Sequence, residues 1–444
     1  MSFPRYPEYK DSGVEWLGKV PAHWNVKRLK QNLRLLTEKT DRRTNPVALE
    51  NIESWSGRFI PTETEFEGEG IAFDKGDILF GKLRPYLAKA LLAEAAGEAV
   101  GDFHVMRPQA DVHARFAQYE ILNRSFIDIV DGATFGSKMP RASWDFLASM
   151  PLPTPPYAEQ TAIATFLDHE TAKIDALVAE QEKLIALLQE KRQAVISHAV
   201  TKGLNPNAPM KDSGVKWLGK VPEHWAVCAL SYLSTIETGS TPDRNDPRYW
   251  NGSIPWLKTG EINWAPIREA DEFITEEGLA NSAARLSPPG TMLMAMYGQG
   301  VTRGRVALLE IEAACNQACA AISFGPRILP TFGRYFFMAA YDHIREGGNE
   351  TSQMNLSAGL IAKFRITVPP IDEQTKIVDW LDAEFARLEA LSGEVERAIA
   401  LLQERRTALI SAAVTGQIDV RGGVSADKAS NFIAASVGSE SVGG

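Results

Sequence analysis

The pattern of apolar and polar positions is most regular in two stretches, residues 155–203 and 369–417. In both, apolar residues recur three and four positions apart, which is the spacing of a heptad helix seam. Both begin with a proline pair, which suits the start of a helix, and they correspond at a constant shift of 214 residues. The predicted helix-packing positions are Leu167, Ile174, Leu177, Leu184, Leu188, Val195, Leu381, Leu388, Leu391, Val395, Leu402 and Leu409.

The length of these stretches predicts how they are buried. A helix of about 45 residues is roughly 65 Å long and cannot bury its apolar stripe against itself. We therefore expect the two helices to pack together as an antiparallel coiled coil within one chain. The alternative is that each helix packs on its own globular domain.

A second repeat precedes each helix. Residues 10–24 read KDSGVEWLGKVPAHW, and residues 211–225 read KDSGVKWLGKVPEHW, at a shift of 201. Between each of these openers and its helix lies an insert, at about 25–150 and 226–364, and the two inserts match each other poorly. A repeated frame that carries two different inserts predicts a pseudo-twofold molecule presenting two distinct binding domains.

The inserts are predicted to be two divergent copies of one small α/β domain, which gives an α+β fold overall. Short runs of β-forming residues are broken by glycine and proline. These runs cover residues 46–55, 76–93 and 101–108, and then 254–262, 290–310 and 318–324. Helices are expected over 116–130 and 332–347. The predicted divisions of the chain are 1–154, 155–203, 204–368, 369–420 and a flexible tail at 421–444.

Composition narrows the class of protein. The chain has 444 residues, is 44% hydrophobic and 23% charged, and carries a formal net charge of -9. These values are typical of globular domains, and the net charge disfavours a nucleic-acid binder that works alone. Because no apolar run is long enough for a membrane helix, we expect a soluble, cytoplasmic protein. The three cysteines are interpreted as free thiols rather than metal ligands.

Motifs for several kinds of chemistry are missing from the sequence, including a nucleotide-binding P-loop, a zinc-protease motif and a nucleophile elbow. Residues 154–157, Thr-Pro-Pro-Tyr, resemble an adenine-methyltransferase motif. Thr154 stands where Asn or Asp is needed, however, so helix-start prolines explain the motif better. The glycines at 298, 300 and 304 favour a hairpin turn over a phosphate loop.

The inserts do offer polar and basic side chains near strand ends and turns. Arg can pair with guanine, Gln or Asn with adenine, and Lys or Thr with phosphate. The alternative is that these residues only solvate turns. The candidate DNA-binding residues are Lys82, Arg84, Tyr86, Lys89, Ser137, Lys138, Arg141, Thr241, Lys258, Thr259, Tyr297, Gln299, Thr302, Arg303, Arg305, Ser352, Gln353 and Asn355. The basic run 26–43 is expected to meet phosphates, and its helical apolar spacing indicates that it also packs.

Taken together, the openers W-L-G-x-V-P-x-H-W, the elements P-P-x-x-E-Q and the helices ending in L-L-Q-E-[KR]-R resemble the DNA-specificity subunits of type I restriction-modification systems. The resemblance covers about residues 9–420. Residues 239–261, with G-S-T-P and Y-W-N-G-S-I-P-W-L-K-T-G-E, are similar to the opening of a target-recognition domain of that family. Residues 81–89, G-K-L-R-P-Y-L-A-K, are similar to another of its recurrent stretches, although the first insert lacks G-S-T-P.

The resemblance implies that each insert is a target-recognition domain reading one half of a split, asymmetric site in double-stranded DNA. The helices would set the unread gap and dock two modification (methyltransferase) subunits, and with them restriction/translocase subunits. This chain would be non-catalytic and bind no cofactor or metal. S-adenosylmethionine, ATP and Mg would be bound by the partners, and no membrane is involved.

Three other functions stay open from the sequence. The chain could be a solitary specificity subunit of a modification-only system. It could be a coiled-coil adaptor whose inserts bind proteins. It could also be a nuclease or methyltransferase itself, but we find neither catalytic carboxylates nor an adenine pocket in the sequence.

Overall fold

The computed structural model describes residues 3–42, 44–62, 68–134, 139–298, 301–346 and 356–422. The chain forms two compact units. Unit 1 comprises Met1–Glu182 and Glu396–Gly444, and unit 2 comprises Lys183–Val395. Each unit therefore contains one opener, one insert and half of each long helix. Of the expected flexible tail, 421–444, residues 423–444 lie outside the described residues, whereas Arg421 is held by ion pairs with Glu159 and Asp419.

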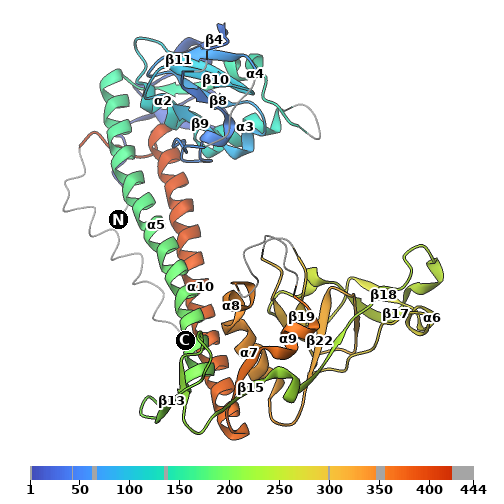
Figure 1. Cartoon of the computed structure of the whole chain (residues 1–444). Helices are drawn as coiled ribbons and strands as arrows, with labels where there is room; N and C mark the ends of the chain where they lie inside the picture. Colours follow the sequence, from blue (N-terminus) through green and yellow to red (C-terminus); the bar gives the residue numbers. More distant parts are fainter. Residues whose placement is uncertain are drawn as a thin grey trace, which may run out of the picture. The chain divides into compact units, whose positions relative to one another are not determined.

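The two long helices are α5 (Tyr157–Lys202) and α10 (Ile371–Val414), of 46 and 44 residues. Each begins directly after its proline pair, as expected. Within each unit they lie side by side (Figure 1). Unit 1 pairs the first half of α5 with the second half of α10, and unit 2 pairs the second half of α5 with the first half of α10. The predicted antiparallel helix pair is therefore confirmed.

The predicted helix-packing positions differ in burial. Leu167, Ile174, Leu188, Leu381, Leu388, Val395 and Leu409 are buried, and Leu184, Val195 and Leu402 are partly buried against the cores. Two equivalent positions differ, since Leu177 is 37% exposed and Leu391 is 39% exposed. A helix of 3.6 residues per turn drifts against a heptad pattern. We attribute the exposure of these two leucines to that drift.

In unit 1 the insert contains two four-stranded sheets. The larger core lies where the first sheet, β4-β11-β8-β9, packs against α2 (Ala114–Ile121) and α3 (Arg124–Gly132). All neighbours in this sheet are antiparallel. The strands are β4 (Leu33–Leu36), β11 (Phe103–Pro108), β8 (Ile78–Gly81) and β9 (Ala90–Leu92). The second sheet has the order β5 (Lys39–Thr40), β7 (Gly70–Phe73), β10 (Gly97–Val100), β6 (Pro46–Val47).

Unit 2 repeats this plan. Its four-stranded antiparallel sheet has the order β16-β22-β19-β20, and α7 (Pro330–Ala339) and α8 (Tyr341–Glu346) correspond to α2 and α3. Its strands are β16 (Ser234–Thr238), β22 (Cys319–Phe324), β19 (Met292–Ala295) and β20 (Val306–Leu308). A three-stranded sheet follows, with β18 (Glu272–Ile274), β17 (Trp250–Leu257) and β21 (Ala314–Cys315). The inserts are thus divergent copies of one domain.

A pair of strands closes each insert where it leaves and rejoins the frame. In unit 1, β3 (Asn25–Arg28) pairs antiparallel with β12 (Pro151–Thr154). In unit 2, β15 (Ala226–Ala229) pairs with β23 (Arg365–Val368) in the same way. The openers form small hairpins from β1 (Tyr9–Asp11) and β2 (Lys19–Pro21), and from β13 (Met210–Asp212) and β14 (Lys220–Pro222). Both ends of each insert are therefore fixed to the start of a long helix.

Polar contacts attach each opener to its helix in the same way. The Trp24 Nε1–H donates to Glu159 at 3.0 Å, and the His23 ring nitrogen lies 2.8 Å from the same carboxylate. In unit 2, Trp225 and His224 contact Glu373 at the same distances. The sequence elements P-A-H-W and P-P-x-x-E-Q are therefore two halves of one contact.

The first opener also contacts the far end of the chain. The Tyr9 hydroxyl donates to the carbonyl of Gly416 at 3.0 Å, and the Asp419 N–H donates to the carbonyl of Pro4 at 2.8 Å. Arg421 lies 3.3 Å from Glu159. Residues that directly follow α10 therefore hold the first opener, much as residues at the end of α5 lead into the second.

The run 26–43 packs as expected, since Leu29 and Leu33 are buried. It forms β3, the short helix α1 (Leu29–Asn32), β4 and β5, because its backbone pairs with β12, β11 and β7. Two other local expectations are wrong. Residues 46–55 contain one short strand and a 3-10 turn. Each expected insert helix is two helices, and in unit 1 the break falls at Asn123, whose side chain caps α3.

Candidate nucleic-acid interface

The hairpin loop between β8 and β9, residues 82–89, carries four of the predicted DNA-binding residues. Arg84 and Tyr86 are exposed, and Arg84 has a left-handed backbone with φ 51°. A non-glycine residue in this region is uncommon and is often found at functional sites. No ion pair of Arg84 is found within the described part of the chain, so its guanidinium group is available to a ligand.

A second segment, residues 139–142, lies beside this loop. The Arg84 N–H donates to the carbonyl of Pro140 at 2.9 Å, and the Ala142 N–H donates to that of Lys82 at 2.8 Å. Arg141 is thereby brought next to the hairpin loop from nearly sixty residues away. The structure thus brings together two groups of candidates that lie far apart in the sequence. Ser137 and Lys138 lie outside the described residues.

Asp102 holds two of these cations. Its carboxylate contacts Arg141 through Nη2 at 2.9 Å and Nε at 3.2 Å, and the Lys82 Nζ lies 3.6 Å away. Burial alone would raise the pKa of Asp102, but the charges of Arg141 and Lys82 outweigh burial and lower this pKa. The three residues form a charged cluster, the Lys82–Asp102–Arg141 cluster, at the base of the hairpin loop.

Lys89 has a different environment from its neighbours. Its Nζ donates to the carbonyl of Leu49 at 2.6 Å, and the residue is half-buried. This contact ties the end of the hairpin loop to the 3-10 turn at Leu49–Asn51. DNA binding by Lys89 stays a prediction, and its visible contact is structural.

In unit 2 the equivalent hairpin loop joins β19 and β20, which pair antiparallel, so the glycine-rich segment is a hairpin as predicted. The Leu356 N–H donates to the carbonyl of Met296 at 3.1 Å, which repeats the contact between Ala142 and Lys82. Tyr297 is 37% exposed, and Thr302 is half-buried. The candidates Gln299, Ser352, Gln353 and Asn355 lie outside the described residues.

The two arginines of this loop have different surroundings. Arg303 donates to the carbonyl of Arg345 at 3.3 Å. Arg305 is half-buried, and its Nε has no hydrogen-bond partner among the residues described. A buried guanidinium nitrogen without a partner is costly and favours a polar ligand nearby.

Thr241, Lys258 and Thr259 lie in another part of unit 2, near the three-stranded sheet. The Thr241 hydroxyl bonds to Gln317, and the Lys258 Nζ lies 2.7 Å from Glu272. Thr259 is half-buried at the start of a 3-10 turn. The structure does not join these three to the hairpin loop by any described hydrogen bond.

Sequence reasoning missed Arg244. Its guanidinium carbon lies 3.8 Å from the ring centroid of Trp250 and 4.7 Å from that of Trp256, and its Nη1 lies 2.5 Å from Glu272. Its partners lie 6 to 28 residues away along the chain, so no local spacing marks it. The two tryptophans on one strand were the signal that could have indicated a cation site.

The described residues hold no group of His, Cys, Asp or Glu that could bind a metal ion. All three cysteines are free thiols; Cys315 and Cys319 are buried and Cys228 is half-buried. No helix in the described ranges is long and apolar enough to cross a membrane.

Comparison with known proteins gives a family match for part of the chain. Residues 222–397 match the model of the type I restriction modification DNA specificity domain. The match covers less than half of the chain. The resemblance to type I specificity subunits is therefore confirmed, and the matched residues comprise the second insert and the first half of α10.

Curated relatives agree with this match. The chain is 24% identical to the specificity subunit of the type I restriction enzyme EcoR124I/EcoR124II of Escherichia coli, over 58% of this chain and 60% of that one. It is 23% identical to the EcoKI specificity subunit of Escherichia coli K12, over 71% of this chain and 68% of that one. The chain spans less than two thirds of the EcoR124I/EcoR124II subunit.

Solved structures share the fold of this chain. One is a chain from a study of complex assembly and conformational transition of the type I R-M system, with TM-score 0.69 and 15% identity, covering 89% of this chain and 98% of that one. Another is the HsdS subunit of Thermoanaerobacter tengcongensis, with TM-score 0.51 and 16% identity, covering 90% and 98%. The α+β fold with a long helix pair is therefore shared by known specificity subunits.

Proposed function

We propose that this chain is the sequence-specific DNA-recognition subunit of a type I restriction-modification complex, and that each insert reads one half of a bipartite, asymmetric target. One observation carries the proposal. The two units keep the same frame and the same sheet order but place different side chains on equivalent hairpin loops. Lys82 and Asp102 in unit 1 correspond to Met296 and Ala318 in unit 2. The Lys82 N–H donates to the carbonyl of Asp102, and the Met296 N–H donates to the carbonyl of Ala318. Different side chains on one frame suit two different DNA sequences.

The long helices are proposed to set the spacing of the two half-sites and to dock two modification subunits. Both helices run without interruption through both units. Exposed leucines on them come in equivalent pairs, Leu177 with Leu391 and Leu187 with Leu401, each at the shift of 214. Unit 1 thus exposes Leu177 and Leu401, and unit 2 exposes Leu187 and Leu391. Equivalent exposed leucines in the two units support two copies of one partner.

The remaining partners and cofactors belong to the same proposal. This chain would be a non-catalytic subunit that binds no cofactor. Modification subunits would bind S-adenosylmethionine, and restriction/translocase subunits would bind ATP and Mg. Such a complex would act on double-stranded DNA in the cytoplasm. The net charge of -9 agrees with partners that supply much of the phosphate contact.

The decisive experiment is single-molecule sequencing of adenine methylation in cells that carry this chain with its modification subunit, compared with cells that lack the chain. We expect a split motif that appears only with the chain. Exchanging residues 226–364 for the insert of another specificity subunit should change one half of that motif. If an active complex with the modification subunit yields no chain-dependent motif, the chain is a protein-binding adaptor instead.

Asp102 provides a prediction about specificity. Asp102→Asn is expected to raise affinity for DNA of unrelated sequence about three- to tenfold, because Lys82 and Arg141 become available to phosphates. The slope of log affinity against log salt should steepen by about one to two. Fluorescence anisotropy of the assembled complex over a salt series measures both. The exposed Glu94 supplies the matched control, Glu94→Gln, and equal behaviour of the two variants would contradict the prediction.

The exposed leucines provide a prediction about assembly. Replacing Leu177 and Leu401 together with Asp is expected to weaken one of the two modification-subunit sites more than tenfold, because burying one leucine contributes about 1.5–3 kcal/mol. Analytical ultracentrifugation should then find one bound partner rather than two. Replacing the equivalent pair, Leu187 and Leu391, with Asp should remove the other bound modification subunit. Two bound copies in both double variants, with unchanged unfolding curves, would rule out this docking face.

A further inference from the structure

Two tryptophans have an unusual backbone at corresponding places in the two units. Trp55 has φ 65° and Trp264 has φ 76°, both in the left-handed region that bulky residues rarely adopt. Each lines a cavity between its insert and the helix pair. Strained residues persist only where their surroundings hold them firmly, and they gather at functional sites. Strain that recurs in both copies points to a shared role.

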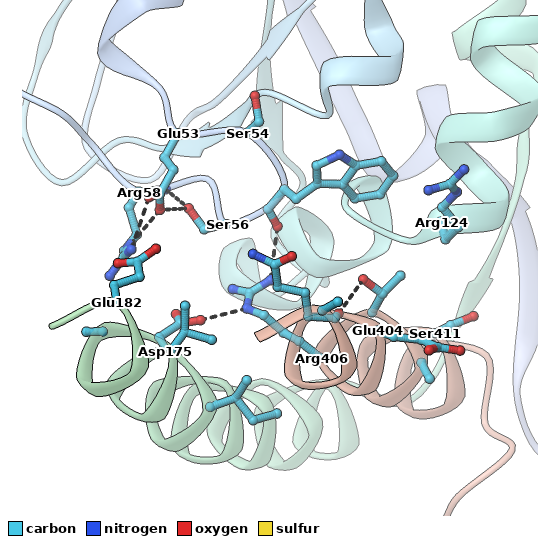
Figure 2. Close-up of a pocket in the computed structure, with 18 of the residues that line it drawn as sticks. Glu53, Ser54, Ser56, Arg58, Arg124, Asp175, Glu182, Glu404, Arg406 and Ser411 are labelled. Atoms are coloured by element: carbon cyan, nitrogen blue, oxygen red, sulfur yellow. Dashed lines mark hydrogen bonds and ion pairs between the residues drawn. The ribbon is translucent and has the colours of Figure 1, made fainter. Parts of the chain in front are cut away.

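The cavity of unit 1 has a volume of about 840 Å³. In Figure 2, Asp175 and Arg406 reach toward each other from α5 and α10, and the labelled residues Glu53 and Arg58 lie on the opposite wall. The Arg406 Nε lies 3.0 Å from Asp175, and its Nη1 donates to the carbonyl of Trp55 at 3.0 Å. Only 12% of the Arg406 side chain is exposed. One guanidinium group therefore joins both long helices to the loop that contains Trp55.

The contact continues from Trp55 to the hairpin loop. The Trp55 N–H donates to the carbonyl of Ala88 at 3.2 Å, and Ala88 is itself left-handed, with φ 48°. Ala88 ends the short 3-10 turn that begins after Arg84 and contains the exposed Tyr86. The guanidinium carbon of Arg124 lies 5.1 Å from the centroid of the Trp55 ring. A short series of bonds thus connects the helix pair to the residues predicted to meet DNA.

In unit 2, side chains connect the corresponding tryptophan loop to the hairpin loop. The cavity of this unit, of about 630 Å³, is lined by Trp264, Tyr341 and Arg192, and Arg192 occupies in α5 the place that Arg406 has in α10. The Trp264 and Tyr341 rings meet edge to face at 4.9 Å between centroids. The Tyr341 hydroxyl donates to the carbonyl of Val301, which lies in the β19–β20 hairpin loop.

We propose that the left-handed tryptophans form positioning sites that fix each recognition hairpin relative to the helix pair, with Arg406 and Trp55 as the positioning residues of unit 1. This inference rests on the proposed function. A cavity lies between the loop at Trp55 and the helices, and the Arg406 guanidinium group contacts both sides of it, through Asp175 and the Trp55 carbonyl. Arg406 touches no DNA in this scheme and acts only through the hairpin loop.

The test uses the complete complex with modification subunits and the methylation motif of the unsubstituted chain. Arg406→Ala is compared with Arg397→Ala, a matched control at an exposed arginine of the same helix. Arg406→Lys keeps a positive charge beside Asp175 but removes the guanidinium group that contacts both Asp175 and the Trp55 carbonyl. For each variant, methylation rates are measured on DNA with both half-sites intact and on DNA with a single mismatch in either half. The half-site of unit 1 is identified beforehand by exchanging the unit 1 insert.

Arg406→Ala is expected to reduce discrimination against mismatches in the unit 1 half-site about tenfold, and to leave discrimination at the other half-site within about twofold. Arg406→Lys should share this loss, and Arg397→Ala should show none. A loss that is equal at both half-sites would indicate general destabilisation and overturn the proposal, as would full discrimination in Arg406→Ala or Arg406→Lys. Absence of any motif with the unsubstituted chain would instead refute the proposed function itself.

Discussion

Replacing Trp24 with alanine is expected to lower the free energy of unfolding of unit 1 by about 3–5 kcal/mol. The Trp24 side chain is fully buried, and it meets Tyr6 edge to face at 5.6 Å between ring centroids. Truncation leaves a cavity and removes the indole donor from the buried Glu159 carboxylate. Hydrogen exchange over a urea series measures the loss, because it reports the stability of amides in each unit separately.

The chain supplies its own matched control for this prediction. Trp225 has the same burial in unit 2 and the same 3.0 Å contact, with Glu373. Trp225→Ala should therefore lower the stability of unit 2 amides and spare those of unit 1, the reverse of Trp24→Ala. Trp24→Phe keeps most of the apolar volume and loses the hydrogen bond, so it should cost about 1–2 kcal/mol. If both alanine variants lower both units equally, the units unfold together and the prediction is wrong.

Much of the frame could be predicted because the sequence contains it as an internal repeat. The proline pairs gave the helix starts to within two residues, and leucines at heptad spacing gave the antiparallel pairing of α5 and α10. The contact of Trp24 with Glu159 could not be derived from one copy. The duplicated H-W and E-Q elements, which recur as Trp225 and Glu373, were a signal that these residues belong together.

The local errors have physical causes. Residues 26–43 have helical apolar spacing, yet their backbone pairs with β11 and β12, about 70 to 130 residues away, and buries Leu33 in β4 and Leu29 in the short helix α1. Tertiary pairing overrides local periodicity in short segments. Asn123 was a cap signal inside the expected helix 116–130, and it divides α2 from α3.

The candidate site was predictable by type but not by arrangement. Lys82 and Arg84 were found because basic residues follow a strand at a turn. Their connection to Arg141 through Asp102 depends on a bridge between distant segments, which no spacing in the sequence indicates. The strain at Trp55 was equally invisible, because a left-handed backbone at tryptophan contradicts the preference of the residue itself.

Glu120→Gln is expected to remove a pH-dependent loss of stability of about 1–3 kcal/mol from unit 1. Glu120 lies in α2, is 2% exposed, and its Oε1 has no hydrogen-bond partner among the described residues.

Burial raises the pKa of Glu120 well above the ordinary glutamate value. The folded chain therefore keeps a proton that the unfolded chain releases, and stability falls as the pH rises from the unfolded pKa toward the folded one. Urea unfolding of unit 1 at about pH 5 and about pH 8, followed by hydrogen exchange, should show this fall in the unsubstituted chain and in the exposed control Glu94→Gln. Glu120→Gln carries no titrating proton and should lack that part of the fall. An identical pH dependence in Glu120→Gln would show that the Glu120 carboxyl group is not held protonated by the fold.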